Sequence, residues 1–508
     1  LPLVQGDQFT SVDCSALDYG EDLDGDGKNE RVDVRLVVAV TAIEPVETPL
    51  ASFPAAVRLE SRITATVHAT GSSRSQTVES RQIEWLVSGI GVVKRQSEVP
   101  GTSATTDVLV GYRVGSALKG LVGRRTLTTG TMHAPLHAAP LGGGYLVASG
   151  NGAQPSSGDA ARALALQVKP GGPAGTPFTL LEFPSPPPTP PLPPPPPLEV
   201  SAPALVARGT GLLAAASTWS GIGGDIRVQR IDATGAPLDG QGGRIAATAT
   251  SSNQGFGGGP WLATDGTGFL LVWSELDRLQ ALRLDASGQP VGQVQMLAGP
   301  TLFYQGPGSA SVSFDGTRYL VLYEWLADSS SELRALHLET DGTVVEQTPL
   351  VLSDRPGGKE VVSSLFDGAQ HLLLLVDGRD PAGPALTLRR LDPSGAFLDG
   401  DAATGGLVLG QLPAAGAARM AFDGERTFVT WVDGRTIRLL RITSAGVQLD
   451  EQGGRPGVVA VDFDPTSNPS FDELTPLPTG DGALELLYLV HDSIALDPPT
   501  LRGVLFGP

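Results

Sequence analysis

The chain has 508 residues, and its 35 lysines and arginines against 54 aspartates and glutamates give a formal net charge of −19. An acidic chain lacks the basic face that nucleic acids and anionic lipids require, and no segment approaches the ~18 apolar residues of a membrane span. The 65 glycines and 42 prolines disfavour long helices and favour short strands with tight turns. The single cysteine, Cys14, excludes an internal disulfide and a thiolate metal site. We therefore expect an all-β protein with neither a nucleic-acid partner nor a membrane span, and too long for one ordinary core.

Residues 1–122 predict an N-terminal antiparallel β domain. Segments rich in valine, isoleucine and threonine alternate partly with polar residues at 31–41, 56–69, 79–86, 92–96 and 107–114. None of them takes part in the repeat that organises the rest of the chain.

An acidic segment near the start of this domain has the spacing of a calcium loop. Aspartates alternate from Asp22, a glycine at Gly27 allows the sharp turn, and hard oxygen donors at such positions suit Ca²⁺. The candidate ligands are Asp22, Asp24, Asp26, the Lys28 carbonyl, Glu30 and Asp33. The loop resembles the calcium loops of the EF-hand and dockerin kind, although a short aspartate replaces the bidentate glutamate. A solvated Asp/Gly hairpin without an ion is the alternative.

Two further segments carry a resemblance to a known class of domain. The run Trp-Leu-Val-Ser-Gly-Ile-Gly-Val-Val-Lys at 85–94 and the run Val-Glu-Thr-Pro-Leu-Ala-Ser-Phe at 46–53 are similar to segments of β-rich domains of bacterial envelope proteins. The resemblance implies an envelope or secreted setting and assigns no catalytic residue. From the residues alone, Trp85 is a core aromatic and Gly89 and Gly91 form a turn.

The rest of the chain contains an internal repeat. Asp-Gly turns at 265–266, 315–316, 367–368 and 423–424 are each followed by an apolar strand, and weaker copies occur at 142–144, 209–211 and 481–482. The turn glycines from Gly266 to Gly482 lie 50, 52, 56 and 58 residues apart. Four short strands per unit of roughly 50 residues is typical of a propeller blade. Residues 123–508 are therefore expected to form a seven-bladed β-propeller of four-stranded blades.

A second turn and a leftover segment refine this prediction. The third strand of several repeats ends in Asp-x-Ser/Thr-Gly, as at 232–235, 285–288 and 392–395. The last repeat ends at its third strand, whereas the β-like run at 124–133 precedes the first repeat. We expect this run to close the ring as the outer strand of the last blade, because an open sheet edge is a liability.

Residues 184–198 contain 11 prolines in 15 positions, which requires a polyproline II conformation. The segment is either a stiff surface spacer or a docking segment for an aromatic groove on a partner or another copy of the chain.

The repeats resemble those of secreted bacterial propellers in which Trp-x-Asp-x-Arg follows the second strand. The segment Trp-Val-Asp-Gly-Arg at 431–435 matches fully, and 375–379 lacks the tryptophan. From the residues alone, this motif is a structural turn with an ion pair. The resemblance and the start at Leu1 rather than at methionine indicate an exported protein, outside the cell or on its surface.

No nucleophile elbow, phosphate loop or dinucleotide motif is present. Inner-strand side chains that could face the propeller channel are His137, Ser311, Ser313, Ser363 and Arg419, and we interpret them as channel lining. The sequence thus predicts a non-catalytic module for protein interaction or self-assembly, stabilised by Ca²⁺ if the acidic loop binds it. The alternative is a propeller that binds or cleaves polysaccharide with carboxylates and aromatics at the channel mouth.

Overall fold

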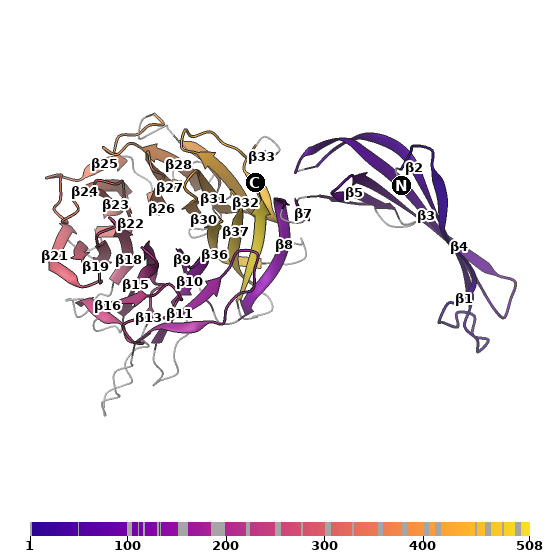
Figure 1. Ribbon diagram of the computed structural model, residues 1–508, viewed down its shortest axis with the longest axis horizontal. Coiled ribbons are helices and arrows are strands. Elements are labelled where there is room, and N and C mark those ends of the chain that lie inside the picture. Colours follow the sequence, from indigo (N-terminus) through magenta and orange to yellow (C-terminus); the bar gives the residue numbers. More distant parts are fainter. Residues whose placement is uncertain are drawn as a thin grey trace, which may run out of the picture. The chain divides into compact units, whose positions relative to one another are not determined.

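The computed structural model describes residues 3–48, 50–98, 104–109, 111–114, 117–129, 132, 134–150, 161–183, 199–219, 224–248, 256–275, 278–299, 306–327, 330–353, 359–377, 384–400, 406–411, 418–452, 455–462, 469–479, 482–492 and 499–507. The polyproline segment 184–198 lies outside them. The described elements are all strands (Figure 1). They divide into two compact units, Leu1–Val122 with Gly507–Pro508, and Gly123–Phe506.

The first unit is built on one antiparallel sheet with its strands in chain order. Its strands are β1 (Gln8–Asp18), β2 (Arg31–Glu47), β3 (Ser52–His68), β4 (Ser75–Val87), β5 (Gly91–Glu98) and β6 (Thr105–Val108). Strand β1 was not anticipated, because its polar residues mask the pattern. The strand expected over 107–114 is interrupted, since β6 ends at Val108 and β7 (Gly111–Val114) pairs instead with β8 (Ala117–Thr129).

One end of this sheet carries the core of the unit. Trp85 is buried and packs with Phe53, Ile83 and Val93. The indole N–H of Trp85 donates to Glu44 Oε1 at 2.7 Å, and the Lys94 ammonium lies 4.8 Å from the ring centroid. The interpretation of Trp85 as a core aromatic is therefore confirmed.

The second unit is a β-propeller made of antiparallel sheets. The first sheets are β9 (Leu136–Leu141), β10 (Gly144–Ser149), β11 (Ala161–Val168), β12 (Phe178–Phe183); β13 (Glu199–Val200), β14 (Ala204–Arg208), β15 (Gly211–Trp219), β16 (Asp225–Ile231), β17 (Arg244–Thr248); and β18 (Phe256–Thr264), β19 (Phe269–Glu275), β20 (Arg278–Leu284), β21 (Pro290–Ala298). The next are β22 (Gly306–Phe314), β23 (Tyr319–Ala327), β24 (Ser330–Leu338), β25 (Leu350–Ser353); and β26 (Lys359–Phe366), β27 (His371–Asp377), β28 (Ala385–Leu391), β29 (Leu407–Gln411). The last are β30 (Ala418–Phe422), β31 (Arg426–Asp433), β32 (Thr436–Thr443), β35 (Val458–Asp462); and β36 (Pro469–Pro478), β37 (Leu484–Asp492), β38 (Thr500–Gly507). A small hairpin, β33 (Glu451–Gln452) with β34 (Arg455–Pro456), precedes β35.

The first strands of these sheets contact one another in turn. Strand β9 contacts β14, β14 contacts β18, and the series continues through β22, β26, β30 and β36 back to β9. Strand β8 is the neighbour of β38, so a segment that precedes the other propeller sheets in the chain supplies an outer strand to the C-terminal one (Figure 1). The sheets therefore form a closed ring.

Apolar second strands fill the space between sheets. Every residue of β19 is buried, because sheets on both sides cover it. Its side chains divide between two cores: Leu271 and Trp273 pack with the preceding sheet, whereas Leu270 and Val272 pack with the following one. This burial explains why the second strands read as continuous apolar runs in the sequence.

A polar contact that the sequence analysis missed recurs on the third strands. The backbone N–H and the side chain of a basic residue both donate to a carboxylate nine residues downstream. The pairs are Arg230 with Asp239, His337 with Glu346, Arg390 with Asp399 and Arg441 with Asp450. Each pair fixes the chain that follows the third-strand turn.

Candidate functional site

The acidic loop lies between β1 and β2 and brings three carboxylates together. The loop closes where Tyr19 N–H donates to the Glu30 carbonyl and Glu30 N–H donates to the Glu21 carbonyl, both at 2.9 Å. One oxygen each from Asp22, Asp24 and Glu30 lies within 4.8 Å of the others. Among the residues that the structure describes, this is the one such group of three metal-ligating side chains.

Backbone amides hold these carboxylates in place. Asp22 accepts from Gly25 and Gly27 at 2.6 and 2.8 Å, and Glu30 accepts from the amides of Leu23 and Asp24 at 2.8 and 3.0 Å. The Gly27 amide lowers the pKa of Asp22, so the loop favours its ionised form. Such an arrangement offers oxygen ligands to a hard cation and also suits an Asp/Gly hairpin.

Two other predicted ligands, Asp26 and Asp33, are not members of this group of three. Asp26 accepts from Lys28 N at 2.9 Å and from Thr70 Oγ1 at 3.1 Å. Asp33 lies on β2, where it accepts from Ala16 N at 2.7 Å and is 2.8 Å from His68 Nε2. The Ala16 amide and the His68 side chain together lower the pKa of Asp33. The structure thus gathers Asp22, Asp24 and Glu30, and pairs Asp33 with the opposite strand.

Beside the loop, the sheet is hollowed by a cavity of about 940 Å³. Leu23 from the loop, Val67 from β3 and Val78 from β4 are among its lining residues. This cavity is continuous with a larger feature, the apolar face of the sheet.

Alternate residues along strands β1 to β4 point to the same side of the sheet and make that face apolar. Residues that pair directly across antiparallel strands lie on the same face. Following the register from Leu36 gives Phe9, Val12, Cys14 and Leu17 on β1; Val32, Val34, Leu36, Val38 and Val40 on β2; Leu59, Ile63, Ala65 and Val67 on β3; and Val78 on β4. Ser61, Gln76, Ser80, Gln82 and Glu84 occupy the rest of this part of the face. We call this set the apolar face.

Part of the apolar face is open to solvent, whereas Val32, Val38 and Val40 on β2 are buried. Phe9 is 46 % exposed, Leu17 45 %, Val78 45 % and Ile63 39 %. The opposite face of the same strands carries ion pairs, such as Glu60 with Arg62 and Arg81. The face that carries the ion pairs is therefore polar, whereas the apolar face exposes hydrophobic side chains to solvent.

In the propeller, the first strands line a central cavity of about 440 Å³. One register position, three residues before the end of each first strand, contributes to this lining from every sheet. The residues are Ala138, Leu205, Trp261, Ser311, Ser363, Arg419 and Thr475, which we call the channel ring. Three neighbouring members are apolar and the other four are polar, so the channel has two unlike halves.

The charges near the channel ring are balanced. Arg419 Nη2 lies 2.8 Å from Oε1 of Glu473, whose side chain is almost fully buried. His137 also lines the channel, and its Nδ1 lies 3.0 Å from the Pro203 carbonyl. Burial, and secondly the positive charge of Arg419, lower the pKa of His137 to about 4, so this imidazole is neutral at pH 7.

Hydroxyl groups complete the polar half. Ser311 Oγ and Ser364 Oγ are 2.7 Å apart and link two neighbouring sheets. The hydroxyl of Thr475 is buried and has no hydrogen-bond partner among the described residues. Of the five side chains expected to face the channel, His137, Ser311, Ser363 and Arg419 line it. Ser313 does not, because it is buried against His371 Nδ1 at 3.0 Å.

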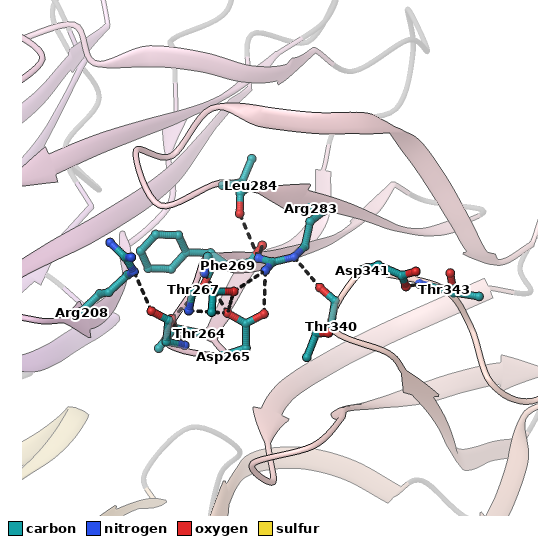
Figure 2. Close-up of polar contacts among 12 residues, drawn as sticks. Arg208, Thr264, Asp265, Thr267, Phe269, Arg283, Leu284, Thr340, Asp341 and Thr343 are labelled. Carbon is teal, nitrogen blue, oxygen red and sulfur yellow. Dashed lines mark hydrogen bonds and ion pairs between the residues drawn. The ribbon is translucent and has the colours of Figure 1, made fainter.

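A further polar cluster surrounds Arg283 on β20 (Figure 2). Its guanidinium donates to Asp265 Oδ2 at 2.6 Å, to the carbonyls of Phe269 and Leu284 in its own sheet, and to the carbonyl of Thr340 in the next sheet. Because these acceptors occupy the donors of the guanidinium, the cluster is a structural connection between sheets.

Neither family models nor curated proteins match this sequence. Solved structures similar to the chain include a GH43 endo-arabinanase from Bacillus licheniformis (14 % identity, 53 % of this chain and 97 % of that one, TM-score 0.31) and TolB from Acinetobacter baumannii (12 %, 60 % and 79 %, 0.27). The Dos1 propeller is another (10 %, 78 % and 88 %, 0.31). At these TM-scores the likenesses carry no argument about function, and the propeller architecture stands on its own strand order and pairing. No helix among the described residues is long and apolar enough to cross a membrane.

Proposed function

We propose that this chain is a non-catalytic module of the cell surface or extracellular space, in which a seven-bladed propeller is the rigid body and the N-terminal sheet joins copies of the chain. The apolar face is the observation that carries this proposal. The closed row of first strands, β9 to β36 and back to β9, supports the count of blades. Resemblance to secreted propeller repeats and envelope-type segments supports the location.

The size of the apolar face is sufficient for association. Four strands about 4.8 Å apart and ten residues at about 3.3 Å per residue give the whole face, polar positions included, an area of about 600 Å². The largest apolar patch on a typical monomer is about 300–600 Å² and is often functional. Two such faces in contact bury about 1,200 Å², the lower end of the range for specific protein interfaces.

A second copy is the partner that fits this face best. Two sheets pack face to face when both inner faces are apolar, and the interface of a two-fold dimer presents the same patch from both partners. The apolar face is polar at its β4 side, with Ser80 and Gln82, so a copy offset toward β1 and β2 meets the most apolar surface. Glu84, which pairs with Leu59 and forms an ion pair with Arg95, adds a charged residue at this same β4 side.

Binding to polysaccharide is a second candidate, and the composition of the channel favours it over cleavage. Glycoside hydrolysis ordinarily uses two carboxyl groups that flank the scissile bond. The carboxylate described beside the channel is Glu473, and it is paired with Arg419.

Sedimentation velocity with a matched pair of variants tests the self-association. Ile63 and Thr64 are adjacent on β3 and lie on opposite faces. A charge at Ile63 would have to be buried between copies, so Ile63→Glu should weaken association by at least about a hundredfold. Thr64→Glu should associate as the wild type does. A wild-type chain that stays monomeric at high concentration, or equal behaviour of both variants, would overturn the proposal.

A further inference from the structure

The channel ring has the composition of a binding site for a small uncharged ligand, and this point is independent of self-association. Ala138, Leu205 and Trp261 come from three successive sheets and form its apolar half. Trp261 packs partly against the core between β19 and β23 and also lines the channel. A tryptophan in this position presents an aromatic surface to whatever occupies the cavity.

The polar half offers both donors and acceptors without net charge. Ser311, Ser363 and Thr475 contribute hydroxyls, each able to donate one hydrogen bond and accept two, and Ser311 already shares one hydrogen bond with Ser364. The charge of Arg419 is balanced by Glu473, and His137 is neutral at pH 7. An anionic ligand would have to compete with the Glu473 carboxylate, whereas a neutral one need not.

The buried hydroxyl of Thr475 is one of several buried polar atoms that have no hydrogen-bond partner among the described residues. A buried polar group without a hydrogen bond is costly, and nearly all such groups in proteins find a partner. Among the described residues none supplies one for Thr475 Oγ1, although the side chain lies in the channel wall. A hydroxylated molecule in the channel can supply it after a rotation of the threonine side chain.

We propose that the channel ring binds one neutral sugar unit, with a C–H face of the pyranose against Trp261 and its hydroxyls toward Ser311, Ser363 and Thr475. A pyranose has one apolar surface and a rim of hydroxyls, which matches the two halves of the ring. The cavity of about 440 Å³ falls within the range of about 300–1,000 Å³ that small-molecule sites occupy. One described carboxylate, already paired with an arginine, suits binding without cleavage.

Ligand-observed NMR and calorimetry on the full chain test this site, with the methyl glycosides of glucose, galactose and mannose as neutral probes and glucuronate as the charged probe. We expect at least one neutral glycoside to bind with millimolar affinity. Ser363→Ala and Thr475→Val should each weaken that affinity about three- to tenfold, and Trp261→Leu about tenfold. Thr248→Val is the matched control, because Thr248 lies on the outer strand β17 and its hydroxyl bonds Asp225; it should bind as the wild type does.

Three results would overturn the proposal: no neutral glycoside binds, the control loses affinity as much as the channel variants, or glucuronate binds while the neutral probes do not. The last result would mean that the glucuronate carboxylate replaces Glu473 as the ion-pair partner of Arg419. Sugar binding can be measured whether the chain is monomeric or associated. A negative result in this experiment therefore does not bear on the proposed self-association.

Discussion

The Glu485 carboxylate accepts two hydrogen bonds from the Arg125 guanidinium, at 2.7 and 2.6 Å, although 360 residues of sequence separate the two. Arg125 lies on β8 and Glu485 on β37. The same carboxylate accepts from the Gly171 amide at 3.1 Å, and Arg125 also donates to the Lys169 carbonyl. The pair therefore ties the outer strand, the last sheet and the first sheet together where the ring closes.

Removing Arg125 should destabilise the whole propeller. Only 1 % of the Glu485 side chain is exposed, so Arg125→Leu leaves a buried carboxylate without its countercharge. We expect a loss of about 2–4 kcal/mol in the free energy of unfolding, measured by urea titration. The control is Arg162→Leu, which breaks an exposed pair with Glu182 and should cost about 0–1 kcal/mol. Equal losses for the two variants would contradict this role.

Stability should fall in acid because of the turn aspartates. Burial raises the pKa of Asp265, but the Gly268 amide, the Thr267 hydroxyl and amide, and Arg283 together outweigh this, so the net pKa is lowered. A carboxyl whose folded pKa is depressed binds protons more readily in the unfolded chain, where its pKa is about 3.9. Its contribution is present above about pH 4 and is lost as the pH falls through the folded value.

Asp265→Asn should therefore flatten the acid limb of a plot of melting temperature against pH, while lowering the melting temperature at pH 7. Asp341 serves as the comparison, because the Thr343 amide lowers its pKa but the carboxylate is exposed. A steeper or unchanged acid limb in Asp265→Asn would show that this carboxylate does not drive acid unfolding.

Calcium should bind the acidic loop through Asp22, Asp24 and Glu30. Three carboxylates this close repel one another, and a divalent cation relieves the repulsion. After treatment with a chelator, calorimetric titration with CaCl₂ should give a dissociation constant of about 0.1–1 mM, as in extracellular modules. Asp24→Asn should abolish the heat, and Asp13→Asn, on exposed β1, should not. Absence of calcium heat in the wild type would leave the Asp/Gly hairpin as the correct interpretation.

Much of the propeller could be predicted from its turns. Asp-Gly pairs follow the first strands β18, β22, β26 and β30, and the structure has positive φ at Gly266 and Gly316. Counting three residues back from these strand ends finds Trp261 and Ser311 of the channel ring. The position of Thr475 could not be predicted in this way, because the turn of the last repeat has a different length. Five residues separate the paired Pro478 and Leu484, whereas four separate the paired Phe314 and Tyr319.

The features that depend on side-chain partners could not be read from the sequence. Asp33 has calcium-loop spacing, but its position on β2 directs it to His68 across the sheet. The apolar face emerges only when the register of four strands is known, because bulges shift the alternation in β1 between Thr10 and Val12 and between Cys14 and Leu17. Strand pairing, rather than local composition, decides both.

The alkylation rate of Cys14 tests the central claim most directly. Cys14 is the one cysteine of the sequence and lies on the apolar face, beside Val34. If copies associate through this face, the rate constant for alkylation of Cys14 should fall as protein concentration rises, and Ile63→Glu should restore the fast rate seen at high dilution. A rate constant that is the same at every concentration, in both the wild type and Ile63→Glu, would contradict the account.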